Sequence, residues 1–241
     1  MKKILTIIVC NKFDGEIAAP YDDIEVLYTD GEYECADIIK NAVKQANGKY
    51  IAFSDGAVDV LNAEALSAAL QKASCDIMEF ESGILFKAQV VRTVSSKDIT
   101  GRIALEIKAA LNARDFVMTK IEPLNLHNER CLYSDKNSEM LLSVIDDFNK
   151  QKSRVSKETY AFAREMLCGV LYYFYADAML KIRKGGLQSQ IFVQFDDKLK
   201  ENIVLYLALG QKFKNLKLQK IRDKKFKIGL FDEMALKSIL K

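Results

Sequence analysis

The chain has 241 residues, of which 49% are hydrophobic and only two are prolines. This length and composition suit one sizeable folded domain, or a domain with a smaller one appended, and they exclude intrinsic disorder. The formal net charge of +3 comes from 36 basic and 33 acidic residues, so no global field argues for nucleic acid as a partner.

The cysteines and the single histidine limit the kinds of disulfide, metal site and catalytic mechanism that the chain can support. The five cysteines are isolated and never spaced as CxxC; they stand at positions 10, 35, 75, 131 and 168. This usage is typical of a reducing compartment and argues against a disulfide framework or a zinc site, so we expect a cytoplasmic location. His127 lies in a polar stretch, and because no GxSxG nucleophile motif occurs we expect it at the surface rather than in catalysis.

The first part of the chain alternates short strands with helices. Strands are predicted over 4–10, 24–28, 50–53, 76–80 and 83–94, the last range holding one or two of them. Helices are predicted over 34–46, 62–70, 99–113 and 139–148. Gly48 is expected to close the first helix in a left-handed conformation, and Asn62 to cap the second.

After residue 160 long helical patterns take over. Helices are predicted over 161–182, 194–209, 212–225 and 231–240. Between residues 212 and 227, lysines and arginines alternate with apolar residues. This basic amphipathic pattern suits peripheral contact with an anionic membrane surface. The alternative, which we favour, is a solvated helix whose apolar stripe docks on the protein core.

A compact succession of motifs runs from Asn41 to Leu66. A small helix leads to the turn Ala46-Asn47-Gly48, then to a buried strand over 50–53, and then to an acidic turn between Asp55 and Asp59. Open α/β sheets present carboxylates in this way at the carboxyl end of a strand, where their ligands bind. The segment therefore predicts a ligand-binding α/β domain.

These motifs resemble those of the family-two glycosyltransferases, which have the GT-A fold. Lys40 and Asn41 stand where that family has Arg-Asn, and Ala46 to Gly48 stand where it has Ala-Lys-Gly. The ranges that resemble the first two strands, the Glu-Asp motif with its helix, and the strand after it are 5–11, 24–31, 132–145 and 156–160. The resemblance covers residues 1 to about 160 and is strongest over 1–66.

The resemblance implies an α/β fold of the GT-A type, with an open mixed sheet flanked by helices and a C-terminal helical subdomain. The implied glycosyltransferase domain spans 1–160, with a nucleotide-sugar-binding half over 1–95 and an acceptor half over 96–160. A C-terminal helical region follows over 161–241.

The resemblance also implies an inverting transfer of a sugar from a nucleotide-diphosphate sugar, with a UDP-sugar as the leading candidate. The acceptor would be the hydroxyl of a carbohydrate or of a lipid-linked molecule, in cell-surface polysaccharide or glycolipid synthesis, in the cytoplasm or at the inner face of the membrane. The residues implied at the nucleotide are Asn11, Asp30, Lys40, Asn41 and Asp55. Asp59 would hold Mn²⁺ or Mg²⁺, and Asp135 would be the general base, with helix N-capping as its alternative role.

Departures from the family pattern support a second interpretation. Ala57 and Val58 replace acidic residues, and Thr29 and Ser134 replace the first members of two acidic pairs. The segment 12–23 is also too short for the family's usual first helix. The alternative is therefore a catalytically degenerate GT-A protein that binds a sugar nucleotide or a partner. An unrelated nucleotide-binding α/β protein has little support, because no P-loop or GxGxxG motif follows the first strand.

Overall fold

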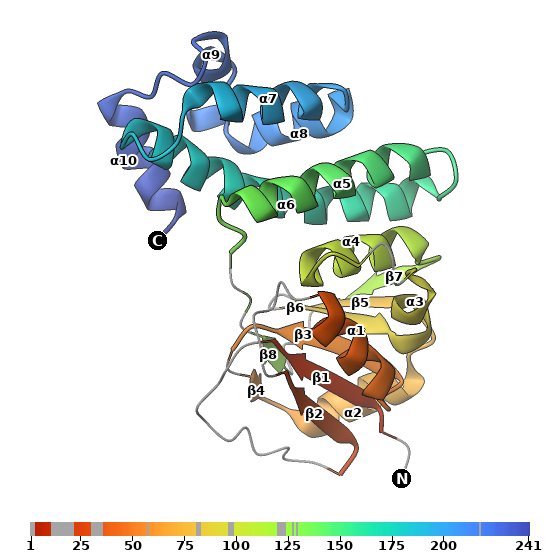
Figure 1. Ribbon diagram of the computed structural model, residues 1–241. Helices are drawn as coiled ribbons and strands as arrows, with labels where there is room; N and C mark the ends of the chain where they lie inside the picture. Colours follow the sequence, from red (N-terminus) through yellow and green to blue (C-terminus); the bar gives the residue numbers. More distant parts are fainter. Residues whose placement is uncertain are drawn as a thin grey trace. The chain divides into compact units, whose positions relative to one another are not determined.

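The computed structural model describes residues 3–10, 22–29, 36–56, 58–80, 83–95, 99–119, 124–126, 128, 130–216 and 218–241. Residue contacts divide the chain into two units (Figure 1). Unit 1 comprises Met1–Glu129 and Val155–Tyr160, and unit 2 comprises Arg130–Arg154 and Ala161–Lys241. The division differs from the single boundary expected after residue 160, because residues 130–154 already belong to unit 2.

Unit 1 is built on a six-stranded mixed sheet with the strand order β2-β1-β3-β6-β5-β7. The strands are β1 (Leu5–Val9), β2 (Ile24–Tyr28), β3 (Tyr50–Ser54), β5 (Ile77–Phe80), β6 (Gly83–Lys87) and β7 (Phe116–Met118). Strand β1 is parallel to β2 and β3, and β5 is parallel to β7, whereas β6 is antiparallel to β3 and β5. A separate antiparallel pair joins β4 (Val58–Val60) and β8 (Leu124–Leu126).

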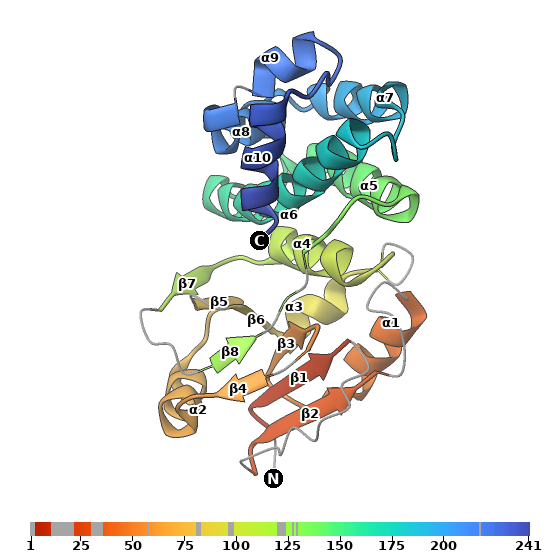
Figure 2. The ribbon, with the colours of Figure 1, turned by 90° about the vertical axis from the view of Figure 1, so that its left-hand side faces the viewer.

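Both faces of the sheet are covered, which confirms the open mixed sheet flanked by helices. Alternate residues of β1 and β3 point to opposite faces, and every residue of both strands is buried. One face packs in an apolar cluster with α2 (Ala63–Lys72), β4 and β8. Figure 2 shows α1 (Ala36–Gln45), α3 (Ala88–Thr93) and α4 (Arg102–Asn112) on the other face.

Gly48 has a different role from the expected left-handed helix cap. Among the described glycines, Gly185 is the one whose φ lies in the left-handed region, so the prediction for Gly48 is wrong. A Cβ at Gly48 would lie 2.4 Å from the amide nitrogen of Thr6 and 2.7 Å from the carbonyl carbon of Leu5. The amide of Gly48 also donates to Thr6 Oγ1 over 2.8 Å. Glycine is required here because the turn before β3 packs directly on the backbone of β1.

Glu25 completes this corner of the sheet. Its carboxylate accepts hydrogen bonds from the Thr6 hydroxyl over 2.6 Å and from the amide and side chain of Asn47 over 2.9 and 2.8 Å. Burial acts to raise the Glu25 pKa, but these hydrogen bonds and the charge of Lys3 outweigh it and lower the pKa below 4.5. The turn Ala46-Asn47-Gly48 is thus tied to β1 and β2 by an ionised carboxylate.

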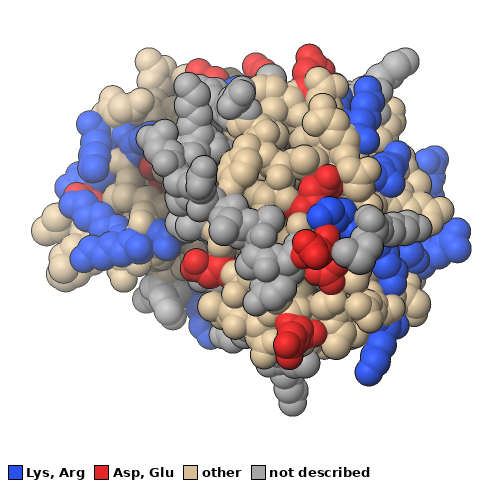
Figure 3. Space-filling view, turned by 90° about the horizontal axis from the view of Figure 1, so that it is seen from below, with Lys and Arg blue, Asp and Glu red and all other residues tan. Residues whose placement is uncertain are grey.

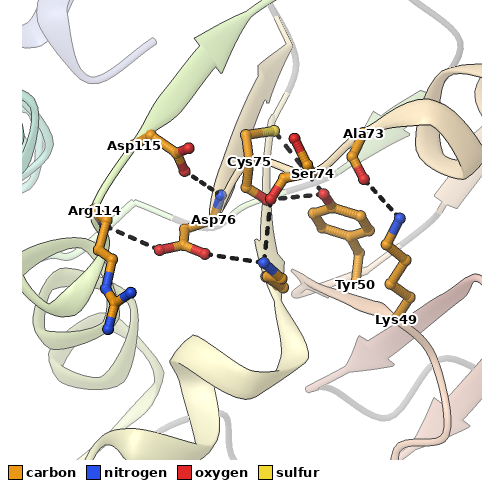
Figure 4. Close-up of polar contacts among 9 residues, drawn as sticks. Lys49, Tyr50, Ala73, Ser74, Cys75, Asp76, Arg114 and Asp115 are labelled. Atoms are coloured by element: carbon orange, nitrogen blue, oxygen red, sulfur yellow. Dashed lines mark hydrogen bonds and ion pairs between the residues drawn. The ribbon is translucent and has the colours of Figure 1, made fainter.

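A second polar network lies around the amino-terminal ends of β3 and β5 (Figure 4). Lys49 Nζ donates to the carbonyl oxygens of Leu70 and Ala73 over 3.1 and 2.6 Å, at the carboxyl end of α2. The Tyr50 hydroxyl donates to the carbonyl of Cys75 over 2.8 Å. The network continues through Asp76, Lys87, Arg114 and Asp115. These bonds satisfy backbone groups in the segments between the strands and helices and at the carboxyl end of α2, so we assign the network a structural role.

Two predicted strands of unit 1 are wrong in whole or in part. The strand over 83–94 ends at Lys87, where the amide of Ala88 donates to the carbonyl of Lys49, and α3 follows with one buried face. The segment 156–160, which resembles a strand, instead begins the helix α6 (Lys157–Arg183). Ser156 Oγ accepts from the amide of Thr159 over 3.1 Å, so a serine cap starts a helix there.

Among its described residues, unit 2 contains helices and no strand. Its helices are α5 (Asp135–Gln151), α6, α7 (Ser189–Lys200), α8 (Ile203–Lys212), the short η2 (Lys214–Leu216), α9 (Leu218–Asp223) and α10 (Leu230–Ile239). The single helix predicted over 194–209 is wrong, because Asn202 caps α8 by accepting from the amide of Leu205 over 3.0 Å.

The predicted basic helix over 212–225 is also interrupted, by η2 and the start of α9. Its apolar residues are nearly all inaccessible: Phe213, Leu216, Leu218 and Ile221 are buried. This observation confirms the favoured alternative, in which the apolar stripe docks on the core.

An aromatic core with a buried ion pair holds unit 2 together. Asp196 Oδ1 accepts from the Tyr175 hydroxyl and from Arg222 Nε, each over 2.9 Å. The Arg222 guanidinium lies 3.7 Å from the centre of the Tyr206 ring. Burial raises the Asp196 pKa above its ordinary 3.8, although Arg222 and the Tyr175 hydroxyl oppose the increase. The pair connects α6, α7, α8 and α9.

The surface carries both signs of charge. On the face seen in Figure 3, lysines and arginines gather toward two sides of the view and acidic residues lie between them. This mixture agrees with the small net charge. Within the described part of the chain, no helix combines the length and apolar character that crossing a membrane requires.

Candidate functional site

Polar residues follow three neighbouring parallel strands. Cys10 follows β1, Thr29 follows β2 and Asp55 follows β3. The amide of Cys10 donates to the carbonyl of Ser54 over 2.8 Å. The amide and hydroxyl of Thr29 donate to the carbonyl of Val9 over 3.0 and 3.1 Å. These bonds hold the three residues at the carboxyl ends of the parallel strands, where ligands of open α/β proteins bind.

Asp55 forms a buried ion pair with Arg102, the first residue of α4. Arg102 Nη2 lies 2.9 Å from Asp55 Oδ2, and the two side chains are 4% and 0% exposed. Arg102 Nη1 donates to Asn128 Oδ1 over 2.5 Å. The same nitrogen lies 3.9 Å from Glu106 Oε1, one turn further along α4. One guanidinium therefore gathers two carboxyl groups and an amide at the carboxyl end of β3.

Burial and the acidic neighbours govern ionisation around this pair. Burial raises the pKa of Glu106; Arg102 opposes the increase and Asp55 adds to it. Burial likewise raises the pKa of the Cys10 thiol to about 12 against the opposing charge of Arg102. Cys10 therefore stays protonated at neutral pH, which argues against a nucleophilic thiol. The cluster offers fixed charge and hydrogen bonds to a ligand rather than covalent chemistry.

The residues predicted to contact the nucleotide have different places. Asp55 is at the centre of the cluster, whereas Asn11 and Asp30 lie outside the described residues. Lys40 and Asn41 lie on α1, where Lys40 pairs with a carboxylate one turn earlier over 3.3 Å and Asn41 is exposed. None of the described bonds joins either residue to Asp55 or Arg102. Their contact with a nucleotide stays a prediction.

Asp59, the predicted metal ligand, is exposed on β4 and lies opposite Asn125 of β8. Among the described residues, no group of three or more acidic, histidine or cysteine side chains is placed to hold a metal ion. The carboxylate of Asp55 already faces the positive charge of Arg102. Asp59 lies within strand β4 rather than in the predicted turn. A cation held mainly by diphosphate oxygens, with Asp59 as its protein ligand, stays a prediction.

Asp135, the predicted general base, belongs to unit 2. It is exposed in the first turn of α5, and the Tyr133 hydroxyl donates to its Oδ1 over 3.3 Å. The N-cap is the preceding residue, because Ser134 Oγ accepts from the amide of Asn137 over 3.1 Å. The capping role considered for Asp135 is therefore wrong, and its role as a base stays a prediction.

The sequence does not single out Arg102, Glu106 or Asn128, although a signal for the first two is present. Arg102 and Glu106 stand four residues apart in a helix that is otherwise mostly apolar. Charged side chains are rarely buried without a partner, so the burial of this helix implies an acidic partner for Arg102. The identity of that partner, Asp55, depends on a contact between distant parts of the chain.

No protein-family model and no curated protein matches the chain. Among solved structures, it is similar to a crystal structure of S. aureus TarS 1-349 in complex with UDP-GlcNAc, at 10% sequence identity and a TM-score of 0.53. The match covers 98% of this chain and 90% of that one. At this identity the likeness shows the fold alone. The protein therefore shares its overall fold with this neighbour, in agreement with the open mixed sheet flanked by helices.

Proposed function

We propose that the protein binds a nucleotide-diphosphate sugar at the carboxyl ends of β1, β2 and β3 and transfers the sugar to an acceptor hydroxyl. The observation that carries this proposal is the buried pair of Asp55 and Arg102 at the end of β3. It supplies a fixed carboxylate and a fixed cation where open α/β sheets bind ligands. The fold likeness to TarS, whose structure contains UDP-GlcNAc, supports a UDP-sugar as the first donor to test.

Each residue in the proposal has a defined role. Asn11, Asp30, Lys40 and Asn41 would contact the nucleotide together with Asp55. Arg102 would fix the orientation of the Asp55 carboxylate through their ion pair. Asp59 would be the protein ligand of Mn²⁺ or Mg²⁺, and a bound cation would neutralise charge on the departing diphosphate.

Asp135 would accept the proton of the acceptor hydroxyl, and a direct attack of this kind inverts the anomeric centre. The acceptor is proposed to be a carbohydrate or a lipid-linked molecule in cell-surface polysaccharide or glycolipid synthesis. The proposed location is the cytoplasm or the inner face of its membrane. Loss of the Asp135 carboxylate should then abolish turnover and leave nucleotide binding intact.

A degenerate GT-A protein that binds a sugar nucleotide or a partner without turnover is the second candidate. The observation that favours it is the ion pair itself, because Arg102 engages a carboxylate of the acidic turn. In this case the nucleotide would bind without a cation, and Asp59 would contribute little to affinity.

Calorimetric titration of UDP and other nucleoside diphosphates, with and without Mn²⁺, separates the two candidates. For the enzyme we expect cation-dependent binding that Asp59→Ala weakens at least about tenfold, because the protein ligand of the cation is lost. Glu64→Ala is the matched control, since Glu64 is an exposed carboxylate on α2 of the same unit. A nucleotide affinity that changes neither with Mn²⁺ nor in Asp59→Ala supports the degenerate protein. No binding of any nucleotide at millimolar concentration contradicts both candidates.

The role of Asp135 is tested by release of UDP from a panel of UDP-sugars. We expect Asp135→Asn to lose this turnover and to keep the nucleotide affinity of the wild type. Asp146→Asn on the same helix is the control. Unchanged turnover in Asp135→Asn would remove Asp135 as the base without affecting the proposed donor site.

A further inference from the structure

Three large apolar side chains project from one face of α10, dark blue in Figure 1. Leu230 is 62% exposed, Phe231 86% and Met234 64%. At about 100° per residue these positions span an arc of about 100°. The opposite face packs inward through Leu236, which is fully buried. Helix α10 is therefore anchored in unit 2 while its apolar half-turn remains uncovered.

Exposed lysines lie close to this apolar face in the sequence. Lys224, Lys225 and Lys227 are exposed and precede α10, and Lys237 is exposed within it. The backbone orients the preceding lysines: Lys225 and Phe226 both have positive φ, at 51° and 58°. Phe226 is buried with its ring edge-to-face against Phe192, 4.8 Å between centres. This unusual backbone conformation directs the Phe226 ring into the core and leaves the lysines in solvent.

The acidic residues of α10 are already engaged. Asp232 Oδ2 accepts from the amide of Gly229 over 2.9 Å and caps the helix. Glu233 pairs with Lys237 over 2.7 Å and with Arg183 over 3.2 Å. Glu233 is therefore paired with two cations, and Asp232 stands at the helix N-terminus, where the helix dipole favours its negative charge. The exposed apolar residues of α10 are therefore preceded in the chain by three exposed lysines.

We infer that the α10 face, defined as Leu230, Phe231 and Met234 with Lys224, Lys225 and Lys227, inserts into the surface of an anionic lipid membrane. Phenylalanine, leucine and methionine enter the boundary between headgroups and acyl chains, and the lysines contact anionic headgroups. A second copy of this chain fits the face poorly, because a two-fold contact would bring the same lysines together. The apolar residues of this face are separate from the buried apolar stripe over 212–227, although its lysines belong to that segment. The inference does not depend on nucleotide binding.

Sedimentation with lipid vesicles tests the inference on the full chain without nucleotide. We expect binding to vesicles of equal parts phosphatidylserine and phosphatidylcholine, and much weaker binding to phosphatidylcholine alone. Phe231→Ser with Met234→Ser should weaken binding at least about tenfold, because the inserted area is lost. Lys224→Gln with Lys227→Gln should weaken it by about fivefold for each lysine, and added salt should have the same direction of effect.

The matched control is Ile203→Ser with Leu207→Ser, which removes two exposed apolar residues from α8. We expect it to leave vesicle binding unchanged, and we expect all three variants to keep the melting temperature of the wild type. Absence of wild-type binding to the anionic vesicles would overturn the inference. An equal loss in the α8 control would do the same, as would a wild-type dimer that Phe231→Ser with Met234→Ser converts to a monomer.

Discussion

The two units each contain a buried pair of an aspartate and an arginine, with the same separation and different surroundings. Asp55 and Arg102 in unit 1 are 2.9 Å apart, as are Asp196 and Arg222 in unit 2. All four side chains are at most 5% exposed. The distance and the burial therefore do not distinguish a pair that serves a ligand site from one that serves the core.

The neighbours of each pair make the distinction. In unit 2, the Tyr175 hydroxyl bonds to Asp196 and the Tyr206 ring lies against Arg222, so the pair is enclosed by aromatic residues. In unit 1, Arg102 faces a second carboxyl group, Glu106, and the pair lies at the ends of parallel strands. The pair in unit 1 therefore lies where open α/β sheets bind ligands, whereas the pair in unit 2 is enclosed in the helical core.

The largest effect should follow from breaking the pair in unit 2. Asp196→Ala leaves the Arg222 guanidinium buried without its carboxylate, and we expect unit 2 to lose about 3–5 kcal/mol of its free energy of unfolding. Hydrogen exchange followed by mass spectrometry measures this in peptides of α6 and α7, because it reports each unit separately. Asp197→Ala is the control, since the neighbouring Asp197 pairs with Lys200 at the surface and should change stability by less than about 0.5 kcal/mol. Equal effects of the two variants would contradict a structural role for the buried pair.

A smaller effect is expected for the same change in unit 1. In Asp55→Ala, Glu106 is close enough to Arg102 to replace the lost carboxylate, so we expect a loss of about 1–2 kcal/mol in unit 1. Exchange in peptides covering β3 and α4 gives the value. A loss as large as that of Asp196→Ala would show that the surplus acid does not compensate, and the contrast between the units would fail.

The smallest effect concerns the change in the stability of each unit as the pH falls. The pKa of Glu25 is lowered from 4.5, so its contribution to unit 1 is present above that value and is lost as pH falls through the folded pKa. The pKa of Asp196 is raised from 3.8, which has the opposite sign: its folded form favours the proton, and unit 2 gains from that group as pH falls. Glu25→Gln should cost unit 1 less than about 1 kcal/mol at neutral pH, because solvent screens this partly exposed carboxylate, and almost nothing in acid.

Exchange protection in β2 and α7, corrected for the intrinsic rate at each pH, follows the two groups from about pH 6 to about pH 3. The matched variants are Glu25→Gln and Asp196→Asn. Acid sensitivity of β2 that persists unchanged in Glu25→Gln would assign it to another carboxylate. A loss of protection in α7 that depends on Asp196 would contradict the direction of its pKa.

Local patterns predict much of unit 1. The strands β1, β2 and β3 and the cap at Asn62 are confirmed, because alternation of apolar residues and capping chemistry act over a few residues. Glycine is required at position 48, but for a different reason from the predicted one. Its close approach to Thr6 is a contact between strands, and composition alone does not distinguish it from a left-handed turn.

The limits of prediction appear where distant segments meet. Asp55 is recognisable as a candidate site residue because it directly follows a buried strand. Arg102 is not, because its partner lies in another segment of the chain and one sequence does not state which pairs touch. The break between α7 and α8 depends on Asn202, whose side chain caps a helix only because the chain turns there.

The return of residues 155–160 to unit 1 has a consequence for the order in which the protein is made. Thr159 is buried and its hydroxyl donates to the carbonyl of Ala113 over 3.2 Å, at the end of α4. A ribosome must therefore finish α5, a helix of unit 2, before it releases the last piece of unit 1. Unit 1 therefore cannot complete its fold until residues 130–154 of unit 2 have been synthesised, and a fragment ending at residue 129 would lack residues 155–160 of its own fold.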